Sequence, residues 1–121
     1  MANHKYGCIR DTHDPRDLKQ SHSLIECAST KPKTVDLRSK FPSIYDQVQL
    51  GACTGNAISA LLAYVHEVEK LKVFIPSRLF IYWNERDIEH SINEDSGAQI
   101  RDGIKSVAKQ GVCDEVEWPY I

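Results

Sequence analysis

One apolar stripe constrains the fold of this chain more than any other feature of its sequence. Apolar residues recur at steps of three and four over about 53–71, namely Ile58, Leu61, Leu62, Val65 and Val68. Such spacing predicts an amphipathic helix with one buried face. Because a helix of this kind needs a partner for its stripe, the rest of the chain must supply covering elements.

Two further segments have helical periodicity. One spans about 77–89 after Pro76, with Ser77 as a plausible N-cap. Its bulky side chains, Leu79, Phe80, Tyr82 and Trp83, are expected to be buried, and the run Asn84, Glu85, Arg86 and Asp87 to be polar. The other spans about 98–110, with Ile100, Ile104, Val107 and Ala108 on one face and Gly111 as the stop. The expected core is Ile58, Leu61, Leu62, Val65, Leu79, Tyr82, Trp83, Ile100, Ile104 and Val107.

The remaining segments lack a sustained period. Residues 1–34 are polar and contain two prolines, so an arm laid against a surface is expected there. Residues 35–50 indicate irregular chain with some β character, 90–96 a polar loop, and 112–121 an extended tail. The sequence therefore predicts a mainly α fold with two parts, the arm 1–34 and a helical domain 35–121.

Composition excludes several functions. The 121 residues carry a net charge of −2, which gives no electrostatic support to a nucleic-acid or anionic-membrane partner. No apolar run approaches the roughly 20 residues that span a bilayer, and the N-terminus has no apolar signal region. A cytoplasmic or virion-associated protein is therefore expected rather than a secreted one.

A cysteine stands where the first helix is expected to begin. The partial positive charge of a helix N-terminus favours the thiolate of Cys53, which is the nucleophilic form. The small residues Gly51 and Ala52 leave room for a substrate carbonyl. Gln47, six residues earlier, can donate its amide hydrogen to the oxygen of that carbonyl. The stretch predicts a nucleophile with an oxyanion donor.

The other cysteines suggest no site of their own. Cys8, Cys27 and Cys113 lie far apart and form no C-x-x-C pair, so neither a metal nor another cofactor is expected. His66 lies 13 residues beyond Cys53, about 20 Å along the same helix, and cannot act as its base. His90 is expected to be solvated in the polar loop, and the other histidines, His4, His13 and His22, lie on the arm.

Taken together, these motifs resemble the helical left domain of the papain-like cysteine peptidases. Val35–Arg38 is similar to the start of the mature enzyme, 47–57 to the oxyanion glutamine and nucleophile, and 76–82 to the second helix. Gly111 to Tyr120 is similar to the turn and Trp-Pro-Tyr that precede the second domain. The arm segment 11–17 resembles the short pro-segment of bacterial and large-DNA-virus members.

The resemblance implies a thiol endopeptidase acting on peptide or protein substrates. It makes Cys53 the nucleophile and Gln47 the oxyanion residue. It also places Gly51, Ala52, Ser96, Gly97 and Ala98 at the substrate cleft. In the family the histidine base and its asparagine follow the cysteine by roughly 130–150 residues, on a β-rich right domain. That domain is absent from this sequence, so a separate second chain is a possible partner.

Two positions depart from the family signature, since Leu50 replaces a cysteine and Thr54 an aromatic residue. Three interpretations remain open at this point. The chain is the N-terminal half of a peptidase, inactive alone; or a half-protease that serves as a binding or structural module; or, more weakly supported, a thiol-sensing module that uses Cys53 with Cys8.

Overall fold

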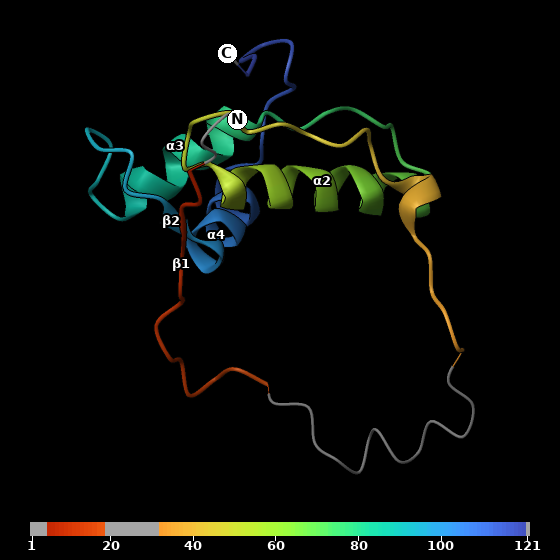
Figure 1. The fold of residues 1–121 in the computed structure, drawn as a ribbon, viewed down its shortest axis with the longest axis horizontal. Helices are drawn as coiled ribbons and strands as arrows, with labels where there is room; N and C mark the ends of the chain where they lie inside the picture. The colour runs from red at the N-terminus through yellow and green to blue at the C-terminus, as the bar shows by residue number, and fades with distance from the viewer. Residues whose placement is uncertain (1–4, 19–31, 121) are drawn as a thin grey trace.

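The computed structural model describes residues 5–18 and 32–120. Its elements are β1 (Cys8–Ile9), η1 (Arg38–Lys40), α2 (Cys53–Val68), α3 (Arg78–Ile88), β2 (Ala98–Gln99) and α4 (Ile100–Gln110). The three helices pack against one another, with α2 longest and α4 crossing behind it (Figure 1). None of the helices described is both long and apolar enough to cross a membrane. The mainly α architecture predicted from the sequence is confirmed.

The helices begin and end close to their predicted limits. Ser77 caps α3, and its hydroxyl accepts the backbone N–H of Phe80 at 3.1 Å. At the far end of α4, Gly111 adopts a φ of 78°, which ends the helix where the sequence indicates. By contrast, residues 35–50, all of which the structure describes, contain no strand, because this chain forms the 3-10 turn η1, isolated bends and one turn at 48–49.

The centre of the molecule lies where the start of α2 meets α3 and β2. Ala52, Tyr82 and Ala98 are fully buried there, with Leu50 and Tyr120 packed against them. Ile58 and Tyr82 are buried as predicted. Five other predicted core residues are half-buried: Leu62, Val65, Leu79, Trp83 and Val107.

The predicted buried faces of α2, α3 and α4 are partly wrong. Ile100, Ile104 and Leu61 are 38%, 52% and 49% exposed, and Ala108 is exposed as well. The buried residues of α4 are instead Asp102, Gly103 and Ser106, and α3 buries Asn84 and Glu85 together with apolar side chains.

Close approach between helices explains this reversal. A Cβ at position 103 would collide with the Glu85 carboxyl and with the end of the Ile58 side chain, so both would have to shift for α4 to pack this closely. The amide of Gln110 then donates to the Asn84 side-chain oxygen at 2.5 Å and to the Ser106 hydroxyl at 3.2 Å. Polar partners inside the contact replace the apolar burial that periodicity predicts.

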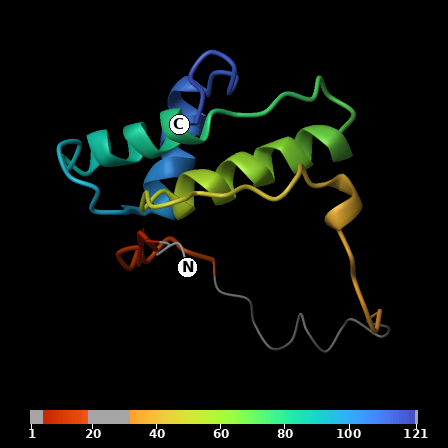
Figure 2. The ribbon, with the colours of Figure 1, turned by 45° about the horizontal axis from the view of Figure 1, so that its top comes forward.

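The arm segment 5–18 lies across the end of the bundle where α2 begins (Figure 2). Its strand β1 pairs in parallel with β2, Cys8 opposite Ala98 and Ile9 opposite Gln99. Asp11 accepts the backbone N–H of Arg101 at 3.0 Å and so caps α4, whose own N-cap residue makes no side-chain cap. Residues 1–4 and 19–31, which include His4, His22 and Cys27, lie outside the described residues.

A second tie holds the C-terminal segment to the helices. The guanidinium of Arg78 makes two hydrogen bonds to Glu115, at 2.6 and 3.0 Å, in a largely buried ion pair. It also lies 4.5 Å from the ring centre of Tyr45 and 4.1 Å from that of Tyr120. This Arg78 clamp therefore joins α3, the loop before α2 and the tail at one point.

Candidate active site

Cys53 is the first residue of α2 and is half-buried. Its neighbour Ala52 is the N-cap, and the first turn carries no acidic side chain. The carbonyl of Ala52 accepts two hydrogen bonds from Asn56, one from the backbone N–H at 3.0 Å and one from the side-chain amide at 2.7 Å. These two bonds fix the start of the helix. The partial positive charge of the helix N-terminus is therefore directed at the Cys53 thiol without a competing carboxylate in that turn.

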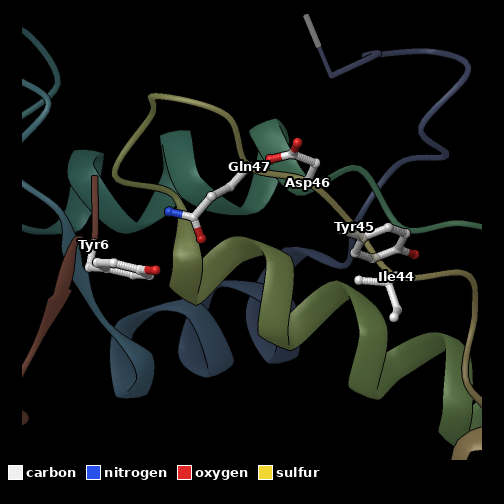
Figure 3. A pocket seen from close by; sticks show the side chains of 5 residues that line it. All are labelled: Tyr6, Ile44, Tyr45, Asp46 and Gln47. Carbon is white, nitrogen blue, oxygen red and sulfur yellow. The ribbon is translucent and has the colours of Figure 1, made fainter. Parts of the chain in front are cut away.

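Gln47 lies in a strained turn just before this helix. Val48 adopts a φ of 54°, an unfavourable conformation for a β-branched residue, and its N–H donates to Asp46 at 2.8 Å. The Tyr120 hydroxyl donates to the backbone oxygen of Gln47 at 2.9 Å, which holds the turn from outside. Figure 3 shows the Gln47 side chain beside the first turn of α2, with Tyr6 of the arm nearby.

The amide of Gln47 is fully engaged. It donates to the carbonyl of Leu50 at 3.0 Å within its own loop and to the carbonyl of Lys5 at 2.6 Å. The second contact is made across the cleft to the arm. A hydrogen-bond donor beside the nucleophile thus already binds a peptide carbonyl, which is the kind of group that an oxyanion donor receives.

Asp95 connects the nucleophile loop to the rim of the cleft. Its carboxylate accepts the backbone N–H of Gly51 at 3.0 Å and the Tyr82 hydroxyl at 2.6 Å. It also accepts the Lys5 ammonium at 2.8 Å. Desolvation by itself would raise the pKa of Asp95, but these hydrogen bonds outweigh it and lower that pKa. Asp95 therefore remains ionised and supplies a non-covalent bridge next to Leu50, where the family signature has a cysteine.

The predicted rim residues take different positions. Gly97 and Ala98 are buried, and the N–H of Gly97 donates to the Tyr82 hydroxyl at 3.1 Å. Burial, followed by the bond to Asp95, raises the pKa of Tyr82, so this phenol stays protonated. Ser96 is exposed, and its hydroxyl donates to that of Ser91 at 3.1 Å.

Backbone of the arm fills the cleft between the rim and the nucleophile loop. Gly7 is buried, and its carbonyl accepts the N–H of Ala98 at 2.8 Å. A Cβ on Gly7 would collide with the backbone of both Gly51 and Gly97, so only glycine allows this approach. The structure thus brings together Gln47, Gly51, Ala52, Cys53, Gly97 and Ala98 around one segment of extended chain.

Cys8 lies on the strand that follows Gly7. Burial raises the pKa of its thiol, and the charges of Cys53, Asp11 and Glu85 raise it further. Cys8, Cys53 and Cys113 are all free.

No histidine among the described residues is positioned to act as a base for Cys53. His66, at the far end of α2, contacts the carbonyl of Lys72 at 3.0 Å and the ring of Phe74. His90 is exposed in the turn after α3, and His13 is exposed on the arm. Within these residues no group of three His, Cys, Asp or Glu side chains could hold a metal ion either.

Sequence reasoning misses two acidic residues beside the site, Glu85 and Asp95. The hydroxyl of Thr54 donates to Glu85 at 2.6 Å, with both side chains fully buried beneath the start of α2. Asp95 is the other, directly before the stretch Ser96, Gly97 and Ala98 that is expected at the cleft. Neither has a sequence signal, because a glutamate within a polar run and an aspartate within a loop are usually solvated.

Comparisons with known proteins agree with this geometry. No family model matches the chain. An uncharacterized peptidase C1-like protein of Acanthamoeba polyphaga mimivirus is 44% identical over an alignment of 131 residues, which includes 95% of this chain and 42% of the viral protein. The structure of xylellain, a cysteine protease from Xylella fastidiosa, superimposes with a TM-score of 0.81 at 46% identity, covering all of this chain and 46% of xylellain.

The chain thus spans less than half the length of each relative. Over that span both sequence and fold agree with a cysteine peptidase, and the matching region includes the three helices and the Gln47–Cys53 stretch. By sequence and by fold, the chain belongs to the papain-like cysteine peptidases and corresponds to their helical left domain.

Proposed function

We propose that this chain is the N-terminal half of a papain-like cysteine endopeptidase and is inactive without a second domain. Cys53 attacks the peptide carbonyl, and the Gln47 amide with the Cys53 backbone N–H binds the oxyanion. The observation that carries the proposal is the 2.6 Å hydrogen bond from the Gln47 amide to a peptide carbonyl beside Cys53. A histidine and an asparagine from outside this chain complete the site.

The arm has a role in this proposal as a short pro-segment over residues 1–34. Lys5 and Gly7 occupy the backbone positions that a substrate needs, at Gln47 and at Ala98. While the arm lies there, substrate cannot bind, so release or cleavage of the arm precedes activity.

An exposed stripe on α2 supports the proposal of a second domain. Proceeding from Cys53 along the helix, Ala57, Leu61 and Val68 are exposed on the same side, because they follow at helical spacing. An exposed apolar stripe that starts at the nucleophile fits a surface covered in the complete enzyme. A hollow of about 380 Å³, lined by Tyr6 and residues 44–47, opens at the loop before α2 (Figure 3).

The same stripe supports a second candidate function. With no base placed by the described residues, a half-protease that retains the fold as a binding module would use this stripe for its partner. The two functions differ in the chemistry of Cys53, since only the peptidase requires an activated thiol with a working oxyanion donor.

Labelling with a peptidyl epoxide distinguishes the peptidase from the binding module. Protein isolated from its source, with whatever chain accompanies it, is treated at neutral pH, and Cys53 is examined by peptide mapping. The peptidase predicts labelling of Cys53 that is lost in Cys53→Ala. Peptide hydrolysis should fall on the order of a hundredfold in Gln47→Ala and persist in Gln49→Ala, an exposed neighbour in the same loop. An unlabelled Cys53 in this material contradicts the peptidase and favours the binding module.

A further inference from the structure

The arm brings a second cysteine, Cys8, to the cleft at which Cys53 lies (Figure 2). Cys8 pairs with Ala98 across the parallel ladder of β1 and β2. Ala98 is fully buried, in one cluster with Tyr82 and with Ala52, the residue before Cys53. Cys8 therefore lies one strand spacing away from a cluster that ends next to the nucleophile.

The neighbouring residue of the arm touches the nucleophile loop directly. A Cβ on Gly7 would collide with the backbone oxygen of Gly51, because the two backbones already lie in contact. The Gly7 carbonyl also accepts the N–H of Ala98 at 2.8 Å, which holds this contact in place. Cys8 follows Gly7 by one residue and Cys53 follows Gly51 by two, so both thiols belong to the segments that meet here.

A disulfide bond fits a juxtaposition of this kind. Its two Cα atoms lie about 4.4–6.8 Å apart, and paired strands are spaced by about 4.8 Å. Cys8 is exposed and Cys53 half-buried, and both are free. Because β1 has only two residues, few hydrogen bonds resist a small adjustment of the arm as the bond closes.

We propose that Cys8 and Cys53 form a reversible disulfide under oxidising conditions, which fastens the arm in the cleft and masks the nucleophile. The oxidant is a small-molecule disulfide such as glutathione disulfide. The pairing rests on the contacts of the arm, and its consequence, a masked nucleophile, rests on the proposed function.

The exchange takes two steps. The thiolate of the exposed Cys8 attacks one sulfur of glutathione disulfide, which forms a mixed disulfide and releases one glutathione. The thiolate of Cys53 then attacks the Cys8 sulfur, so the bond between the two cysteines forms and the second glutathione leaves. The protein gives up two protons and two electrons, which convert glutathione disulfide into two glutathione molecules. Neither step requires a histidine, because ordinary thiols are partly ionised at about pH 8.

The test uses the reduced 121-residue chain, treated at about pH 8 with an excess of glutathione disulfide. Remaining thiols are blocked with N-ethylmaleimide, and the protein is mapped without reduction. The Cys8–Cys53 pair should be roughly tenfold more abundant than any other pairing, because the arm contacts raise the effective concentration of one thiol at the other. Cys8→Ser and Cys53→Ser should each abolish this pair. In concentrated urea the preference should pass to Cys8 and Cys27, which close the shortest loop.

A second measurement shows whether the disulfide forms with the arm in the cleft. The N–H of Ala98 donates to the Gly7 carbonyl while the arm lies there. Its hydrogen exchange should therefore slow about tenfold in the oxidised chain relative to the reduced chain. Gly7→Ala, which removes the close approach to Gly51, should slow formation of the disulfide severalfold. Arg10→Ala, exposed on the same arm, is the matched control and should leave the rate unchanged.

Mixed disulfides alone, or a different pairing in the folded chain, would overturn the proposal. Faster exchange of the Ala98 amide after oxidation would overturn it too, since the bond would then form with the arm outside the cleft. Failure of the proposed function looks different, because the disulfide forms without an activated thiol. If the pair forms but the epoxide does not label reduced Cys53 in protein isolated from its source, the peptidase fails and the pairing stands.

Discussion

Thr54, the residue next to the proposed nucleophile, donates its hydroxyl hydrogen to the buried carboxyl of Glu85 over 2.6 Å. One carboxyl oxygen of Glu85, Oε1, has no hydrogen-bond partner. Burial raises the pKa of Glu85 to about 8 and outweighs the lowering effect of Thr54, so the folded protein keeps this side chain protonated at neutral pH.

Glu85 should therefore make the free energy of unfolding fall as pH rises. Below its ordinary pKa of 4.5 the carboxyl is protonated in both states, and no difference arises. Between pH 4.5 and about 8 only the folded state holds the proton, so stability decreases through this window. Glu85→Gln should remove this dependence on pH and raise the free energy of unfolding by about 3 kcal/mol at pH 7.

Urea unfolding at pH 5 and pH 8 measures this slope. Glu67→Gln on the exposed end of α2 is the control and should leave the slope as in the wild type. If the wild-type chain and Glu85→Gln have the same pH dependence, Glu85 is ionised in the folded protein.

The sequence predicts the helices well because their local signals agree with the fold. The stripe of α2, the Ser77 cap and the Gly111 stop are each determined by residues near in sequence. The orientation of α4 is not, since it depends on Gly103 meeting Glu85 from another helix. A periodicity argument assigns Ile104 to the core and cannot register this contact.

The candidate site divides in the same way. Spacing predicts Gln47 and Cys53, because the two lie six residues apart in one short stretch of sequence. The bridge from Asp95 to Gly51 joins residues 44 positions apart, and the contact of Lys5 with Asp95 joins residues 90 positions apart. No local pattern encodes such pairs.

The Arg78 clamp should be sensitive to a change that preserves charge. Arg78→Lys keeps the positive charge but loses the two-pronged contact with Glu115 and the stacking on Tyr45 and Tyr120. A cost of about 2–3 kcal/mol is expected for this largely buried pair. Arg38→Lys is the matched control, because its pair with Asp36 is exposed and should leave urea unfolding nearly unchanged. Equal effects of the two variants would argue against a structural role for the clamp.

Gly7→Ala should displace the arm from the cleft. The added methyl group has no space between Gly51 and Gly97, so the strand pairing of β1 with β2 is lost. Cys53 should then react severalfold faster with a bulky maleimide, as followed by peptide mapping. Arg10→Ala, an exposed position on the same arm, should leave the rate at the wild-type value. An unchanged rate in Gly7→Ala would mean that the arm does not cover Cys53.

The thiol of Cys8 should report on Cys53. Burial contributes most to its raised pKa, and Cys53 is the next contribution, so Cys8 has less thiolate at pH 8 than an ordinary cysteine. Cys53→Ser removes the second contribution, lowers the pKa of Cys8 and should speed its alkylation by iodoacetamide. The rate at Cys8 is measured from pH 7 to pH 10 by peptide mapping, with Cys113→Ser as the control because Cys113 makes no contribution to that pKa. Identical profiles in Cys53→Ser and the wild type would show that the two thiols do not interact across the cleft.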